Sequence, residues 1–218
     1  MFKSKKLLTI FLAVLVVAGC KAENAVVTIY TSDIEEARSG KVIDVPLKAT
    51  FSIIGEDKEN LLGKATAIAQ KYLSKGSKIS RSKSQFGERL VIETKIPLAK
   101  LGPYKKYVEN KGKRLAAVGV FGNKLYFVVS KPGRESLNKE LRQINYMLSL
   151  DKIIKRATYR IISDSKKQFE ISAYAAWVAK KPYLYYKKIL NRRDEAELTF
   201  KGDDGSIYSQ LKHYITVK

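Results

Sequence analysis

The 218-residue chain contains a single cysteine and a single histidine. One cysteine cannot form an internal disulfide, and sites built from several Cys and His side chains, zinc clusters above all, are excluded. The fold must therefore be held by a hydrophobic core. Apolar residues make up 45% of the chain and aromatic residues 10%, which is typical of a packed domain and not of a disordered basic tail. We expect no metal and no cofactor.

The cysteine stands at the end of a secretion-signal pattern. Three lysines within the first six residues precede an apolar run over residues 7–17, and Val17-Ala18-Gly19-Cys20 closes the run with small residues. This is the layout of a signal peptide, and the run is shorter than the roughly 20 residues of a spanning helix. Its last four residues resemble a bacterial lipobox. The resemblance implies cleavage between Gly19 and Cys20, and acylation of Cys20 with palmitate-type chains.

The residues after Cys20 indicate where such an anchor holds the protein. Two or three acyl chains give stable membrane attachment. By resemblance to enterobacterial sorting rules, Lys21 in place of an aspartate favours the outer membrane, with the domain facing the periplasm. Residues 20–24 are expected to form a lipidated tether, which when extended reaches about 15 Å. We therefore predict a lipoprotein whose folded part sits close to the bilayer.

Removal of the signal peptide, residues 1–19, leaves 199 residues and lowers the net charge from +21 to +18, because three lysines and no acids are lost. Residues 25–218 are predicted to form an α+β domain, with antiparallel sheets, two main amphipathic helices and a strand-rich C-terminal half. Apolar periodicity predicts the helices at 60–74 and 134–150, and capping-box spacing predicts one further helical turn from Ser32. Strands are predicted at 25–31, 42–54, 89–98, 115–121, 124–130, 153–162, 169–178, 183–190, 196–201 and 207–217.

Two features organise this domain. Gly122-Asn123 separates two apolar runs by two residues and gives the best hairpin signal of the chain. A boundary near Asp151 could divide the domain into two subdomains, each with one helix and one sheet.

Candidate catalytic residues do not converge. His213 is the only histidine, and no G-x-S-x-G motif accompanies it. Ser-x-x-Lys spacing at Ser80 to Lys83 and at Ser163 to Lys166 is expected by chance in a chain rich in both residues. Paired carboxylates such as Asp203-Asp204 fit turns and helix starts. We predict a protein that is not an enzyme, with a hydrolase of an envelope polymer as the competing class.

Basic residues gather in several places. One group, Lys71, Lys75, Lys78, Arg81 and Lys83, follows the first long predicted helix. The densest group interleaves cations with rings that suit phosphate contact and stacking, and it is our candidate anion-binding surface: Lys180, Lys181, Tyr183, Tyr185, Tyr186, Lys187, Lys188, Arg192 and Arg193.

Three interpretations of these cations stay open. They are solvated strand faces, a contact for anionic lipid headgroups or lipopolysaccharide, or a nucleic-acid surface. Attachment to a membrane favours the second over the third, because an exported lipoprotein rarely meets nucleic acid.

The start of the mature chain resembles one family. The run from Cys20 to Glu23, followed by Ile29-Tyr30-Thr31-Ser32-Asp33, is similar to a family of bacterial and phage-associated lipoproteins of uncharacterised activity. The resemblance implies lipidation of Cys20 and no reaction. The sequence therefore predicts an envelope lipoprotein that binds an envelope component or scaffolds a complex.

Overall fold

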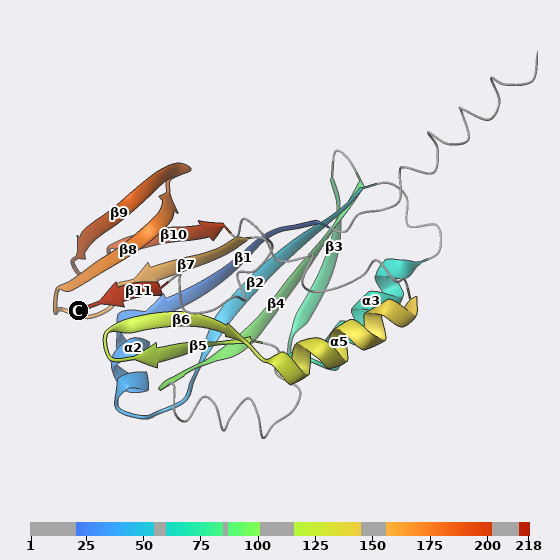
Figure 1. Ribbon diagram of the computed structural model, residues 1–218, viewed down its shortest axis with the longest axis horizontal. Helices are drawn as coiled ribbons and strands as arrows, with labels where there is room; N and C mark the ends of the chain where they lie inside the picture. The colour runs from blue at the N-terminus through green and yellow to red at the C-terminus, as the bar shows by residue number, and fades with distance from the viewer. Residues whose placement is uncertain (1–20, 55–59, 85–86, 101–115, 145–155, 202–213) are drawn as a thin grey trace, which may run out of the picture.

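The computed structural model describes residues 21–54, 60–84, 87–100, 116–144, 156–201 and 214–218. Within these residues the chain forms one sheet of eleven strands and three helices (Figure 1). In chain order the elements are β1 (Lys21–Tyr30), α2 (Thr31–Arg38), β2 (Ile43–Ile54), α3 (Leu61–Gln70), β3 (Lys78–Ser84), β4 (Gly87–Lys100), β5 (Ala116–Phe121), β6 (Lys124–Val129), α5 (Lys131–Ile144), β7 (Arg156–Ile162), β8 (Phe169–Val178), β9 (Lys181–Leu190), β10 (Glu195–Lys201) and β11 (Tyr214–Val217).

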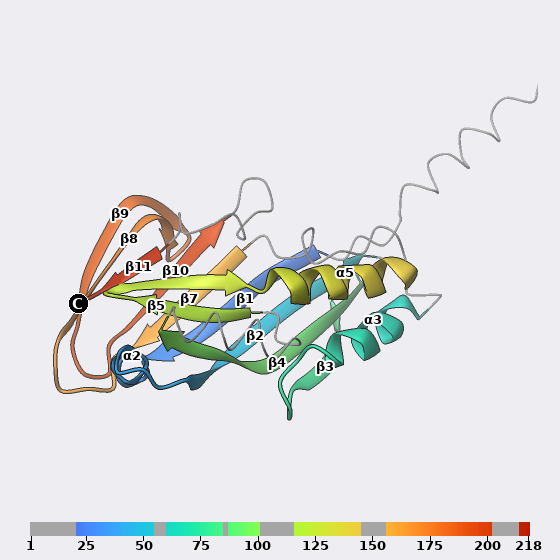
Figure 2. The ribbon, with the colours of Figure 1, turned by 60° about the horizontal axis from the view of Figure 1, so that its bottom comes forward.

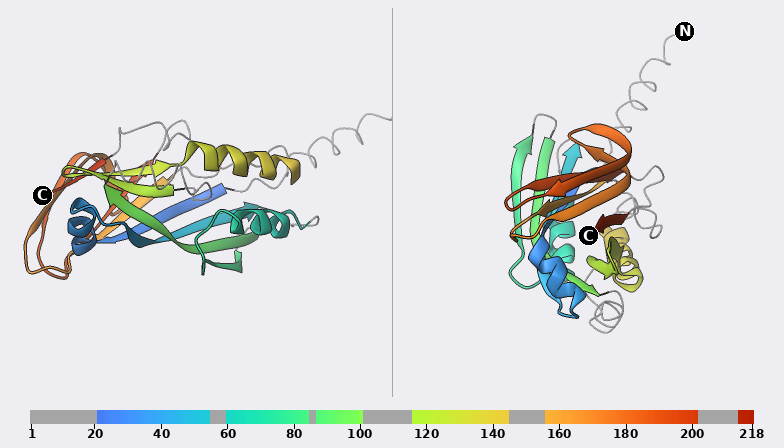
Figure 3. Two further views of the ribbon diagram at one scale, coloured as in Figure 1. Left: turned by 90° about the horizontal axis from the view of Figure 1, so that it is seen from below. Right: turned by 90° about the vertical axis from the view of Figure 1, so that its left-hand side faces the viewer.

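Nine of the described strands close into a barrel, which Figure 3 shows from its end in the right-hand view. The order around the ring is β10-β7-β1-β2-β4-β5-β6-β11-β8, and the pair Thr199 and Trp177 joins β8 back to β10. Two strand pairs in the ring are parallel, β1 with β7 and β4 with β5. β3 and β9 lie outside the ring, where β3 pairs with β4 and β9 pairs with β8.

The predicted α+β class is therefore wrong. The main core is enclosed by the sheet itself, and helices α3 and α5 do not cover a face of it as a layer. They pack chiefly on each other, through Tyr72, Leu137 and Leu141, at one end of the molecule (Figure 2). Local apolar patterns predict the elements, but ring closure depends on pairs such as Ala25 with Ala157 that lie far apart in the sequence.

The barrel core follows the alternation of its strands. Inward-facing residues such as Ile29, Ile161 and Leu198 are fully buried. Tyr159 and Phe200, from neighbouring strands, meet edge to face with ring centroids 5.8 Å apart, a geometry that aromatic pairs prefer. The core is continuous around the ring and contains no ionised side chain among the described residues.

Helix α2 packs into this core and is held by a carboxylate from another part of the chain. Ile34 and Ala37 on its inner face are fully buried. At its start, the carboxylate of Asp164, just after β7, accepts hydrogen bonds from the Ser32 amide (3.0 Å), the Ser32 hydroxyl (2.5 Å) and the Thr31 hydroxyl (2.9 Å). Asp164 therefore caps a helix that begins 133 residues before it.

The C-terminal end of α2 is tied to the barrel by an arginine. Arg38 donates hydrogen bonds to the carbonyl oxygen of Gly122, at the tip of the β5–β6 hairpin, and to that of Val217 in β11. Burial of this guanidinium lowers the pKa of Arg38 from its usual value. Both ends of the helix are thus fixed to strands that are distant in sequence.

Several predicted elements are confirmed. β5 and β6 form the hairpin around Gly122-Asn123, with Phe121 paired to Lys124, and α2 begins one residue before Ser32. The first strand begins at Lys21, so residues 21–24, expected as tether, belong to β1. The boundary near Asp151 falls outside the described residues; strands from both sides of it, such as β1 and β7, share the one sheet.

Candidate binding surface on the β8–β9 hairpin

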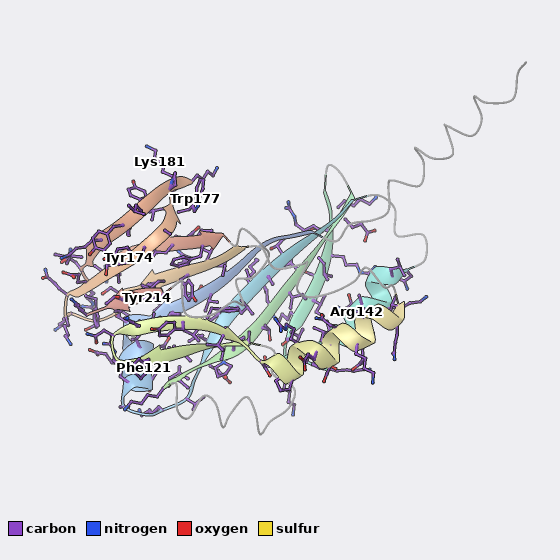
Figure 4. All side chains as sticks on the ribbon, in the orientation of Figure 1. Phe121, Arg142, Tyr174, Trp177, Lys181 and Tyr214 are labelled. Carbon is purple, nitrogen blue, oxygen red and sulfur yellow. The ribbon has the colours of Figure 1, made fainter. Side chains whose placement is uncertain are left out.

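Large apolar side chains are exposed mainly on one hairpin. Among the described residues, eight large hydrophobic side chains are exposed, and five of them lie on β8 and β9: Tyr174, Tyr183, Leu184, Tyr185 and Ile189. Leu184 is the most exposed, at 86%. Figure 4 shows Tyr174, Trp177 and Lys181 on this hairpin, apart from Phe121 at the tip of β5–β6. We call the five residues the hairpin patch.

A shift in the alternation of β8 accounts for the exposure of Leu184 in this patch. Phe169, Ile171 and Ala173 point into the core, but the next buried residue is Ala176, so the inward set moves by one position. Ala175, at the shift, has a left-handed φ of 51°, which is strained for a residue with a side chain. Leu184 lies opposite Ala175 in the strand register and is turned to solvent.

The tyrosines lie on two faces of the hairpin. Tyr174 and Tyr185 are paired across the strands and their ring centroids lie 4.9 Å apart on the outer face. Tyr183 meets Tyr186 edge to face at 5.6 Å, and Tyr186 packs against the barrel core. Burial raises the pKa of Tyr186, and the electrostatic interaction with the neighbouring Tyr183 raises it further by a smaller amount. The structure thus brings the three predicted tyrosines of the candidate surface together and adds Tyr174.

The predicted cations are distributed differently. Lys180 and Lys181 lie at the β8–β9 turn, and Arg192 and Arg193 lie in the turn after β9. The ten-residue strand between these turns is about 30 Å long. The four cations at the ends of β9 are exposed, so they do not form one compact pocket.

The two lysines in the middle of β9 are engaged within the protein. The Lys187 ammonium forms an ion pair with the Glu170 carboxylate at 2.7 Å, and the Lys188 ammonium donates to the main-chain oxygen of Glu195 at 2.8 Å. The hydrogen bond that the Lys187 ammonium donates to Glu170 raises the pKa of Lys187 and lowers the pKa of Glu170. The centre of the surface is therefore aromatic and aliphatic, with cations at its two ends.

β9 also presents a free strand edge. It pairs with β8 along one side, and no other strand among the described residues pairs with it. An exposed edge can pair with another chain, but Lys and Pro discourage such pairing. Lys181, Pro182, Lys187 and Lys188 stand on both sides of the middle of β9, so pairing would be confined to that middle stretch. The stretch from Tyr183 to Tyr186 in the middle of this edge carries no charged side chain of its own, and Lys187 borders it.

The hairpin lies away from Lys21, the first residue of β1. In Figures 1 and 3 the β8–β9 hairpin occupies one end of the long axis, and α3 and α5 lie near the other. β1 begins at Lys21 in the half of the molecule that carries these helices. A membrane anchor just before Lys21 would thus leave the hairpin patch at a distance from the bilayer.

The remaining candidate residues gather into no centre. Gly19, Cys20 and His213 lie outside the part of the chain that the structure describes. Ser80 is on the exposed edge strand β3, and Ser163 is 1% exposed. Within the described ranges, no group of three His, Cys, Asp or Glu side chains could hold a metal ion, and no helix is long and apolar enough to cross a membrane.

Sequence reasoning missed three members of the hairpin patch. Tyr174 and Ile189 lie on the outward side of the alternation that begins with Phe169 and Ile171, and Leu184 is exposed because the alternation shifts at Ala175. The signal that was available is the run of three rings and a leucine at 183–186, which is more than one buried face of a strand can hold.

Comparison with known families gives one match. The model of a domain of unknown function, DUF7424, matches residues 24–200, a stretch that runs from β1 to β10 and includes the hairpin patch. No curated protein and no solved structure matches the chain.

Proposed function

The chain belongs to the DUF7424 family, and we propose that it is a lipid-anchored envelope protein that acts by binding and not by catalysis. In this proposal Cys20 carries the lipid, the barrel stands on the periplasmic face of the outer membrane, and the β8–β9 hairpin binds a protein partner. The observation that carries the proposal is the gathering of five of the eight exposed large apolar side chains of the described residues on this one hairpin.

The chemistry of the patch favours a protein over an anionic polymer. A polyanion is held by cations close to each phosphate or carboxylate, but Lys187 is already paired with Glu170, and the exposed cations of this surface lie at the two ends of β9. Exposed tyrosines and a leucine on a rigid sheet are typical of the centre of a protein interface.

The free edge of β9 suggests how the partner binds. An extended segment can add a strand to an open edge, with main-chain hydrogen bonds supplying affinity and side-chain contacts supplying specificity. Leu184 and Tyr185 would contact alternate side chains of that segment. The cations at the two ends of β9 would then favour acidic residues at the ends of the bound strand.

The anchor is tested by labelling cells with radioactive palmitate. The wild-type chain incorporates the label, whereas Cys20→Ser does not and is released from the membrane fraction. A matched variant, Ser32→Ala, keeps the label because it leaves the lipobox intact. Label that persists in Cys20→Ser would refute lipidation at this residue.

The binding surface is tested by placing a photo-reactive amino acid at position 184 or at position 121. Both native side chains are exposed, at 86% and 64%, and both lie on hairpins, so position 121 is a matched control. We expect one defined protein adduct in native membranes from position 184 and none from position 121. Adduct formation should be lost in Tyr185→Glu. Equal adducts from both positions would contradict a specific surface on β9.

A further inference from the structure

The start of the mature chain and the edge strand β3 share one row of the sheet. Lys21, which directly follows the predicted lipidated cysteine, is paired with Ser52 of β2. Ser52 is paired with Arg89 of β4, which in turn is paired with Ser82 of β3. Three strand spacings separate Lys21 from Ser82, about 15 Å. A membrane that holds residue 20 is therefore close to β3.

Four cations line this edge. Lys75 precedes β3, and Lys78, Arg81 and Lys83 lie on it; all four are exposed. Among the described residues none of the four forms an ion pair. The carboxylate nearest in register to Lys78 is Glu93, which is paired with Lys48 at 3.0 Å. Lys83 lies opposite Glu88 in the register, and within the described ranges these two side chains form no ion pair. The four charges are thus available to an external anion.

Alternation along β3 spreads these cations over both of its faces. Lys78 shares a face with Ser80 and Ser82, whereas Arg81 and Lys83 share the other with Ile79. Ile79 packs against the small cluster of Leu90 and Ile92, so this end of the sheet is ordered up to its edge. The result is a basic rim along the edge of the sheet, with cations on both of its faces.

We propose that this β3 rim, formed by Lys75, Lys78, Arg81 and Lys83, contacts the anionic phospholipid headgroups of the membrane that holds the anchor. The inference rests on the proposed lipidation of Cys20, which places the rim at the bilayer surface. Basic residues attract an anionic surface when they lie within the screening distance, about 8 Å at physiological ionic strength. The rim would orient the barrel on the membrane and turn the β8–β9 hairpin away from the headgroups.

The β3 rim is not the group in which basic residues are most closely spaced along the sequence. The densest basic group, Lys180 to Arg193, lies on the hairpin at the far end of the long axis (Figure 1). Charged residues on an edge strand also discourage pairing with other chains. That role requires no lipid, so the deciding measurement must be binding to vesicles.

The test uses residues 21–218, which contain every element of the described fold, and vesicles of phosphatidylglycerol and phosphatidylethanolamine. The rim variant carries Lys78→Gln, Arg81→Gln and Lys83→Gln. The matched control carries Lys180→Gln, Lys181→Gln and Arg192→Gln, which remove the same charge from the β9 ends. Both triple variants must unfold thermally within about 2 °C of the wild type, as expected for exposed positions.

We expect the rim variant to bind these vesicles about a hundredfold more weakly than the wild type, because each basic residue near an anionic surface contributes several-fold. The control variant should lose less than about fivefold, and binding should fall as salt rises. Equal losses in the two variants, a larger loss in the control, or no binding of the wild type would each overturn the proposal. The palmitate experiment on Cys20 is read separately, so failure of the anchor and failure of the rim are distinguishable.

Discussion

Removal of the Asp164 carboxylate should loosen helix α2 from the barrel. This side chain accepts three hydrogen bonds from the first two residues of the helix, and its own amide donates to the Thr31 hydroxyl at 3.3 Å. In Asp164→Ala these donors lose their acceptor. Thr31 is fully buried, so its hydroxyl gains no water in exchange.

The expected loss follows from the geometry. Replacement of a helix-capping Asp by Ala costs about 1 kcal/mol, and a hydrogen bond to a charged group contributes about 1.5–3 kcal/mol. Asp164 is largely exposed, so solvent screening reduces the charged contribution. We therefore expect Asp164→Ala to lower the free energy of unfolding by about 2 kcal/mol, which corresponds to about 4–8 °C in Tm for a chain of this size.

Circular dichroism during heating, together with urea unfolding at pH 7, measures this loss. Glu36→Ala is the matched control, because Glu36 lies on the same helix and its exposed carboxylate pairs with Lys41 alone among the described residues. An exposed pair of this kind contributes about 0–1 kcal/mol. A loss in Asp164→Ala no larger than that in Glu36→Ala would refute the capping role.

The pH dependence supplies a second criterion. Burial by itself would raise the pKa of Asp164, but the hydrogen bonds from Ser32 and Thr31 outweigh burial and lower the pKa. A lowered folded-state pKa gives stabilisation that is complete above the unfolded value of about 4 and is lost as pH falls through the folded value. The difference between the wild type and Asp164→Asn should therefore shrink at acid pH; a difference independent of pH would contradict the argument.

Three further predictions concern the barrel and its attached elements. Phe200→Ala should cost about 3–5 kcal/mol by leaving a cavity beside Tyr159, whereas Phe121→Ala should stay within about 0.5 kcal/mol in the same urea assay. Ala179 and Lys180 both have positive φ, 47° and 67°, so Asn-Gly at these positions should stabilise the chain by about 1 kcal/mol, measured as a rise in Tm. Burial and the Glu140 carboxylate raise the pKa of Tyr72 to about 12, so ultraviolet titration of Tyr72→Phe should lack one late-ionising tyrosine.

Local patterns predicted much of the secondary structure and little of the way it assembles. The Gly122-Asn123 turn and the strand at 169–178 depend on neighbouring residues, and both appear at the predicted positions. The parallel pair of β1 with β7 and the insertion of β11 between β6 and β8 depend on distant residues. No short-range pattern distinguishes a strand of a closed ring from a strand of an open sheet. For this reason the predicted α+β class was wrong.

The candidate surface shows the same limit. Density of Lys, Arg and Tyr in the sequence led to residues 180–193, and the tyrosines do meet there. The close spacing of basic residues in the sequence could not show that Lys187 forms an ion pair with Glu170, because that contact depends on the pairing of β8 with β9. It also could not place Lys83 in the row next to Ser82 and Lys21, which requires the register of four strands.

The place of β11 in the ring has a consequence for folding kinetics. β11 is the last barrel strand in the sequence, yet in the ring it lies between β6 and β8 and pairs with both. The ring therefore cannot close on a nascent chain until residues 214–217 have emerged, and its long-range pairs belong to the class of topologies that fold in milliseconds to seconds. A protein exported through a narrow channel has to stay unfolded during transit. Under the proposed export, closure that waits for the C-terminal strand would lengthen the time for which this chain stays open.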